Sequence, residues 1–175
     1  RRDRPHSLRA IMSHSRAARR RAVVEADMPS DPISSCEFDS KRLILRLNMT
    51  IQGAVAEVTP AVDRIMAVVQ DMQCAKGKEN EIELALQEAI ANAIVHGCEE
   101  DPSRNVQVCV ACDEERGMLI IIRDPGPGFD PGDIPSPLQG ENLYASGGRG
   151  IYLINELMDE VRYEKGGTEI WMRKQ

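Results

Sequence analysis

The chain has 175 residues, of which 42% are hydrophobic, 29% charged and 3% aromatic, a composition typical of one folded domain with a substantial core. The first 21 residues contain eight arginines and one acid, whereas the remainder carries 14 basic and 27 acidic side chains, a net charge of −13. We therefore do not expect the body of the chain to bind nucleic acid, and no apolar run approaches the ~20 residues that a membrane span requires.

The N-terminal region, residues 1–38, is rich in arginine and then in proline and serine. We interpret it as a basic, flexible extension and linker; an arm that touches RNA or a membrane is the alternative. No apolar stretch follows the arginines, so the region does not resemble a secretory signal. The folded domain is predicted to span residues 39–175.

The predicted elements begin with a strand over 42–51 and a helix over 54–72, in which Pro60 is expected near the first turn or at a break. A second helix is predicted over 79–96. Gly97 follows it, where a C-terminal cap is expected.

The pattern then changes to runs rich in β-branched residues, which predict strands at 105–114, 117–124, 159–165 and 168–174. Gly117 and the pair Gly166-Gly167 provide turns for two hairpins. A Gly/Pro-rich loop and a short helix, from about 150 to 158, lie between the hairpins. Helices first and antiparallel hairpins later predict an α+β fold: a two-layer sandwich in which helices cover one face of a mixed, mainly antiparallel sheet.

The chain contains five cysteines, which do not form the framework of a small secreted domain. Reduced cysteines favour a cytoplasmic protein. Cys109 and Cys112 form a CxxC motif within a predicted strand, where positions three apart point to opposite faces. This geometry argues against a metal site at the motif.

Three polar residues, Glu88, Asn92 and His96, recur at four-residue intervals along the apolar second helix. They lie near the same side of the helix, and burial of such groups requires polar partners or a ligand. The Asn92 amide oxygen suits Mg²⁺, and a carboxylate one turn earlier can hold a metal-bound water or accept a proton from an attacking hydroxyl. A solvated helix face is the alternative for Glu88 and Asn92, and His96 is interpreted as structural, near the negative end of the helix dipole.

Two glycine clusters follow. Asp124 ends the apolar strand and opens the run DPGPG, whose glycines, Gly126 and Gly128, let the backbone approach a flat ligand. The Asp124 carboxylate can accept a hydrogen bond from an exocyclic amine such as that of adenine; a Pro/Gly turn with a capping Asp is the alternative. The second cluster, SGGRG, opens the short helix, where backbone N–H groups and Arg149 can bind phosphate; a flexible loop with a surface arginine is the alternative.

Four segments in this order, ELALQEAIANAIVHG, IIIRDPGPGFDP, GGRGIYLINELMDEVRY and GGTEIWMRK, resemble the Bergerat-type ATP-binding fold shared by gyrase, Hsp90, histidine kinases and MutL. Over about residues 40–175 the chain more closely resembles the bacterial anti-sigma-factor serine/threonine kinases, the switch proteins of sporulation and general stress responses. The arginine-rich extension has no counterpart in the minimal members of that family.

The resemblance implies that ATP and Mg²⁺ are the cofactors. It implies that Glu88 is the general base, Asn92 the Mg²⁺ ligand and Asp124 the adenine-binding acid. Residues 131–147 correspond to a lid over the phosphates, although this segment has few basic residues. The remaining implied contacts are Gly126 and Gly128 beside the base, Gly148, Arg149 and Gly150 beside the triphosphate, and the Thr168 hydroxyl at adenine.

The resemblance further implies a cytoplasmic, homodimeric kinase that phosphorylates an anti-sigma antagonist and otherwise holds a sigma factor, without direct contact to nucleic acid or membrane. A sequestering module that binds ATP without phosphotransfer is one alternative. Glu88 favours catalysis, because ATP binding alone needs Asn92 and Asp124 but no base. A histidine-kinase catalytic domain is another alternative. Such a domain is expected to follow a pair of helices that carries the phosphoacceptor histidine, and the Pro- and Arg-rich residues 1–38 do not resemble such a pair.

Overall fold

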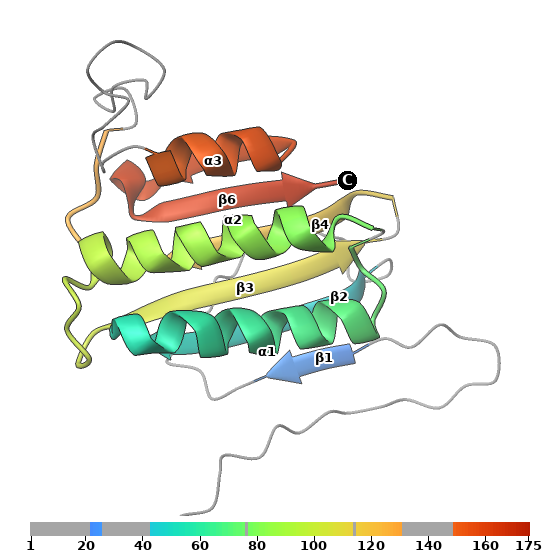
Figure 1. Ribbon diagram of the computed structural model, residues 1–175, viewed down its shortest axis with the longest axis horizontal. Helices are drawn as coiled ribbons and strands as arrows, with labels where there is room; N and C mark the ends of the chain where they lie inside the picture. Colours follow the sequence, from blue (N-terminus) through green and yellow to red (C-terminus); the bar gives the residue numbers. More distant parts are fainter. Residues whose placement is uncertain (1–21, 26–42, 76, 114, 131–148) are drawn as a thin grey trace, which may run out of the picture.

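The computed structural model describes residues 22–25, 43–75, 77–113, 115–130 and 149–175. Its strands form one sheet in the order β1-β2-β3-β4-β6-β5, and its three α-helices lie side by side on one face of that sheet (Figure 1). The strands are β1 (Ala22–Glu25), β2 (Leu43–Gln52), β3 (Asn105–Asp113), β4 (Gly117–Arg123), β5 (Glu160–Glu164) and β6 (Glu169–Lys174). The helices are α1 (Val58–Asp71), α2 (Glu79–Asn92) and α3 (Arg149–Leu157), with short turns at Val55–Glu57, Ala93–Gly97 and Lys165–Gly167.

The predicted α+β sandwich is confirmed, including the mixed sheet. β2, β3, β4, β6 and β5 pair antiparallel, whereas β1 pairs parallel with β2. β1 lies inside residues 1–38 and was not predicted, because four residues are too few for a strand periodicity to stand out. The boundary at residue 39 stays a prediction.

Both predicted hairpins are present. β3 pairs with β4 through a turn that ends at Gly117, whose φ is +76°, and β5 pairs with β6 through Gly166 and Gly167, with φ of +68° and +88°. Glycine populates this left-handed region without the steric cost that other residues incur. The pairing of β4 with β6 then joins the two hairpins into one sheet.

The main core lies between the helices and the sheet. Alternate residues of β3 and β4, such as Val108, Val110 and Ile120, pack there against Ile82 and Leu86 of α2. The opposite face of the sheet carries a smaller buried cluster, made by Cys109, Leu119 and Ile121 with Trp171 packed against it.

The two cysteines of the CxxC motif face opposite sides of the sheet, as predicted. Cys112 belongs to the main core, whereas Cys109 belongs to the smaller cluster on the other face. Among the residues that the structure describes, no three His, Cys, Asp or Glu side chains gather in a way that could hold a metal ion. None of the described helices combines the length and apolar character of a membrane span.

The first predicted helix is divided into a 3₁₀ turn and α1. Pro60 is the third residue of α1, in the first turn, where a backbone N–H has no partner within the helix. The prediction for Pro60 is therefore confirmed.

The second predicted helix differs in its last turn. The α-helix ends at Asn92, and Ala93–Gly97 form a π-helical turn closed by a hydrogen bond from Cys98 N–H to the Ala93 carbonyl at 2.9 Å. The predicted helix over 79–96 is therefore confirmed in extent, but its π-helical last turn was not predicted, because a π turn leaves no distinct periodicity in so few residues. Glu88 and Asn92 are half-buried, whereas His96 is exposed.

Candidate nucleotide-binding site

The start of α3 lies directly against Glu88 and Asn92 of α2. A Cβ placed on Gly150, the second residue of α3, would stand 2.6 Å from Glu88 Oε2 and 3.3 Å from Asn92 Nδ2. The first of these distances is too short for a Cβ unless the end of the Glu88 side chain moves, so glycine lets the Glu88 carboxylate lie directly against the start of α3. The structure thus brings together three residues that the sequence assigned to the phosphate end of one site.

Glu88 and Asn92 lie half-buried on α2 without a polar partner among the described residues. Both side chains are half-buried on α2, and neither forms a hydrogen bond or ion pair within the part of the chain that the structure describes. Water or a ligand can therefore reach both side chains, and a carboxylate and a carboxamide one turn apart present oxygen atoms that suit Mg²⁺. Glu88 and Asn92 are thus the residues that would hold a hydrated Mg²⁺ ion next to the start of α3.

Arg149 and Gly150 begin α3, so their backbone N–H groups are among those without helical partners. The positive end of the helix dipole lies at the same place, and the Arg149 side chain is exposed. This combination favours an anionic ligand at the start of α3. Gly148 and the predicted lid, residues 131–147, lie outside the described residues.

Asp124 follows β4 and is held by the backbone on two sides. Its N–H donates to the Thr168 carbonyl at 3.0 Å, and its Oδ1 accepts a hydrogen bond from Gly126 N–H at 2.8 Å. Oδ2 accepts no hydrogen bond within the described residues, so it keeps its capacity to accept one from a ligand.

Gly97 and Gly126 enclose the Asp124 carboxyl group. A Cβ on Gly97 would overlap that carboxyl group, and a Cβ on Gly126 would stand 2.7 Å from Gly97 Cα. The end of the π turn therefore packs directly on the Asp124 segment. In this way Asp124 meets the same helix that carries Glu88 and Asn92.

Gly97 was predicted to be a helix cap, and this prediction was wrong. The cap is Cys98, and Gly97 is not among the residues with positive φ. Glycine is required at position 97 for space, because a side chain would collide with Asp124. The sequence does place a glycine directly after a helix that carries Glu88 and Asn92, but it does not show which neighbour needs the space.

Replacing Gly97 with alanine is expected to displace the Asp124 carboxyl group and to weaken nucleotide binding by at least about tenfold, since small misplacements of binding groups have large effects. Isothermal titration calorimetry with ATP measures this change. Gly77→Ala is the matched control: Gly77 has a φ of +86° and nothing lies within 4 Å of a Cβ placed on it, so alanine there strains the backbone without touching Asp124. Equal affinities for the two variants would contradict the role of Gly97.

Gly128 and Thr168 lie side by side next to the Asp124 segment. Gly128 has a φ of +77°, and a Cβ on it would overlap the Gly166 carbonyl and stand 3.2 Å from Thr168 Cγ2. The Thr168 hydroxyl donates to the Lys165 carbonyl at 3.1 Å, which leaves its oxygen free to accept. The structure thus places Thr168 beside the Asp124 segment, while the role of its hydroxyl toward adenine stays a prediction.

An ion pair, which the sequence did not reveal, fixes the strand ends next to these residues. Arg123 Nε lies 2.5 Å from an oxygen of Glu169, directly across from it in the β4–β6 ladder. Glu169 is 3% exposed and also accepts a hydrogen bond from Trp171 Nε1 at 2.8 Å. Because Arg123 precedes Asp124 and Thr168 precedes Glu169, this pair holds both site residues in register.

Burial raises the pKa of the Asp124 carboxyl group, although its hydrogen bond from Gly126 lowers the pKa in part. A carboxyl group whose pKa is raised by folding destabilises the folded protein above that pKa and has no such effect below its unfolded value. Asp124→Asn is therefore expected to raise the free energy of unfolding at neutral pH by about 0.5 kcal/mol; the gain is small because water screens a half-buried carboxyl group.

Urea denaturation of the wild type and Asp124→Asn across a pH series measures this difference, since asparagine can still accept the hydrogen bond from Gly126. The difference is expected to vanish as pH falls below about 3.9, the usual pKa of an aspartate in the unfolded chain. A gain that stays constant down to that pH would show that the charge of Asp124 is not its cause.

Residues 51–174 match the histidine kinase-like ATPase domain family. This match covers most of the chain and both ends of the site, so the chain belongs to that family of ATPase domains. Its similarity to individual proteins narrows the class further. It is similar to the anti-sigma F factor of Priestia megaterium, with 26% identity over 135 residues that cover 72% of this chain and 80% of that protein.

The chain is also similar to the serine-protein kinases RsbW of Bacillus licheniformis and Bacillus subtilis (strain 168). The identities are 34% and 32% over 101 residues, which cover 54% of this chain and 62% of each kinase. These similarities confirm the resemblance to anti-sigma-factor serine kinases that the motifs predicted.

Proposed function

We propose that the chain is an ATP-dependent protein serine kinase that phosphorylates an anti-sigma antagonist and sequesters a sigma factor. The observation that carries the proposal is the position of Glu88 one turn before Asn92, with both side chains against Gly150. A protein that only bound ATP would need no carboxylate at the phosphate end. The names of the similar proteins, anti-sigma F factor and serine-protein kinase, supply the class of partner.

One end of the site binds the adenine base and the other end binds the phosphates. Asp124 accepts a hydrogen bond from the adenine amino group, and the Thr168 hydroxyl assists at the base. Gly126 and Gly128 let the backbone approach the base, while Gly148, Arg149 and Gly150 bind the phosphates. Asn92 would hold Mg²⁺, which, when bound, neutralises charge on the β- and γ-phosphates.

Glu88 acts on the acceptor hydroxyl. As the serine oxygen of the antagonist attacks the γ-phosphorus, the Glu88 carboxylate accepts the hydroxyl proton. The bond between the γ-phosphorus and the bridging oxygen breaks, and ADP leaves. Arg149 and the N–H groups at the start of α3 stabilise the charge that develops on the leaving diphosphate.

The proposal includes a cytoplasmic homodimer whose partners are proteins. The net charge of −13 outside the first 21 residues favours protein partners over nucleic acid. The proposed function assigns no role to the basic extension.

The test is recovery of the full chain with its partners from the source cell, followed by addition of ATP labelled at the γ-phosphate. Label on a serine or threonine of a small co-purifying protein is the expected result. Recovery of a sigma factor without any label would instead favour a sequestering module, and label on a histidine would favour a histidine kinase.

A further inference from the structure

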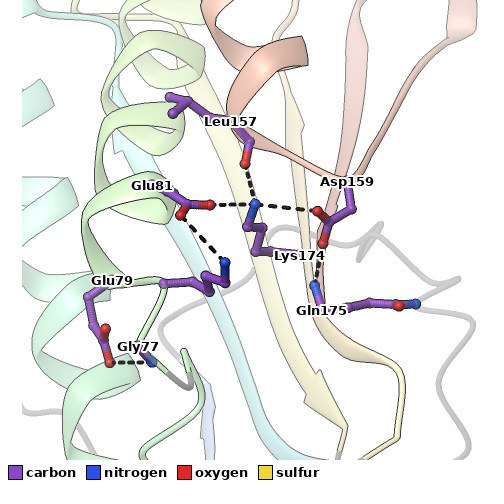
Figure 2. A network of polar contacts seen from close by, with 8 residues as sticks. Gly77, Glu79, Glu81, Leu157, Asp159, Lys174 and Gln175 are labelled. Atoms are coloured by element: carbon purple, nitrogen blue, oxygen red, sulfur yellow. Dashed lines mark hydrogen bonds and ion pairs between the residues drawn. The ribbon is translucent and has the colours of Figure 1, made fainter.

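Lys174, at the end of β6, is a buried lysine with three partners from two parts of the chain (Figure 2). Its Nζ donates to the Leu157 carbonyl at 2.6 Å and lies 2.5 Å from Glu81 Oε2 and 3.3 Å from Asp159 Oδ1. The Lys174 side chain is only 9% exposed. A buried ammonium group needs such partners, because the loss of hydration is costly without them.

These partners lie at the ends of two helices. Glu81 is in the first turn of α2, and Leu157 is the last residue of α3, where helical carbonyls lack partners within the helix. Asp159, just beyond α3, also accepts a hydrogen bond from Gln175 N–H at 2.7 Å. Lys174 therefore joins the C-terminal end of α3 to the N-terminal end of α2.

The same two helices meet again at the nucleotide site. Gly150, near the start of α3, lies against Glu88 of α2. At the other end of α3, Leu157 is linked to Glu81 of α2, because both residues bond to Lys174. Both Glu81 to Glu88 and Gly150 to Leu157 are separations of seven residues, or about 10 Å along each helix axis. The helices therefore run antiparallel and are connected at two levels two turns apart.

We infer that Lys174 is a positioning residue: it holds α3 at one axial position on α2 and thereby holds Gly150 over Glu88 and Asn92. An ammonium group has three donors and can satisfy the Leu157 carbonyl and both carboxylates together. The start of α3 at Gly150 lies directly against the Glu88 carboxylate, so a small axial shift of α3 changes the phosphate end of the site. Only the identity of the ligand, ATP, is taken from the proposed function; the contacts of Lys174 do not depend on it.

The first test needs no nucleotide. Lys174→Met is expected to speed hydrogen exchange of the amides of residues 150–157 by about tenfold, because the end of α3 loses its anchor. Glu81 and Asp159 have side chains 37% and 47% exposed, so water can solvate both and the variant should fold. Lys78→Met is the matched control, since Lys78 pairs with the same Glu81 at 3.7 Å and, within the described residues, has no ion pair with α3.

The second test compares ATP with adenosine, which lacks phosphates. Lys174→Met is expected to weaken ATP binding by about tenfold and to leave adenosine binding within about twofold of the wild type, because Asp124 follows β4 and is held by Thr168 and Gly126. Lys174→Arg should restore part of the ATP affinity, since it keeps the charge. A general loss of folded protein would weaken both ligands equally.

Three results separate the inference from the proposed function. Unchanged exchange in α3 of Lys174→Met, or exchange as fast in Lys78→Met, would overturn the positioning role whether or not ATP binds. Equal loss of ATP and adenosine affinity would also overturn it. A wild type that binds neither ligand would overturn the proposed function, while the exchange experiment would still decide the role of Lys174.

Discussion

Replacing Glu88 with alanine is expected to slow phosphotransfer to the antagonist by about 10²- to 10⁴-fold, the usual contribution of a general base. ATP binding should change by less than about threefold, since Asn92, Asp124 and the start of α3 remain in place. Transfer of labelled γ-phosphate and calorimetric titration of ATP measure the two effects separately. We expect a large effect on the rate and a small effect on the affinity because the Glu88 carboxylate lies against the start of α3.

Glu83→Ala is the matched control, because Glu83 is an acid on the same helix but is exposed. Its phosphotransfer rate should equal that of the wild type. Glu88→Gln keeps the shape of the side chain and removes the base, so it should be as slow as Glu88→Ala. Normal phosphotransfer by Glu88→Ala would refute the assignment of Glu88 as the base.

Replacing Asn92 with alanine is expected to weaken binding of ATP in the presence of Mg²⁺ by about 10- to 100-fold, a typical loss when a metal site is disturbed. Without Mg²⁺ the affinity should differ from that of the wild type by less than about threefold, because the amide oxygen acts through the ion. Titrations with excess Mg²⁺ and with a chelator measure this contrast.

Asn155→Ala serves as the control for Asn92→Ala. Asn155 is an exposed asparagine of α3 whose amide donates to the Ile151 carbonyl at 2.7 Å. Its Mg²⁺ dependence should match that of the wild type. An equal loss of affinity with and without Mg²⁺ in Asn92→Ala would show that Asn92 supports the helix and does not bind the metal.

The sequence predicted the parts of the site that depend on local spacing. Glu88 and Asn92 lie one turn apart on a helix that periodicity identifies, and Asp124 follows a strand rich in isoleucine. The hairpin turns at Gly117 and Gly166 were predictable for the same reason, because each turn joins segments adjacent in the chain. These features therefore require no knowledge of tertiary contacts.

The features that the sequence did not predict depend on contacts between distant segments. Gly97 needs its small size because of Asp124, and Arg123 is paired with Glu169 because β4 happens to neighbour β6. Lys174 looks like an ordinary charged residue near a strand end until α2 and α3 are packed against it. Loop-separated pairings of this kind leave no periodic signal in the sequence.

The position of Gly150 has a consequence for motion within the site. Asp124 and Thr168 are joined by a backbone hydrogen bond at the end of the β4–β6 ladder, whereas Glu88 and Gly150 meet only where two helices pack. Packed helices can slide by small amounts at little energetic cost, but a strand ladder changes register only in whole steps. If ATP binds as proposed, the base would therefore meet the half of the site that strand pairing fixes, and the phosphates would meet the half that can adjust.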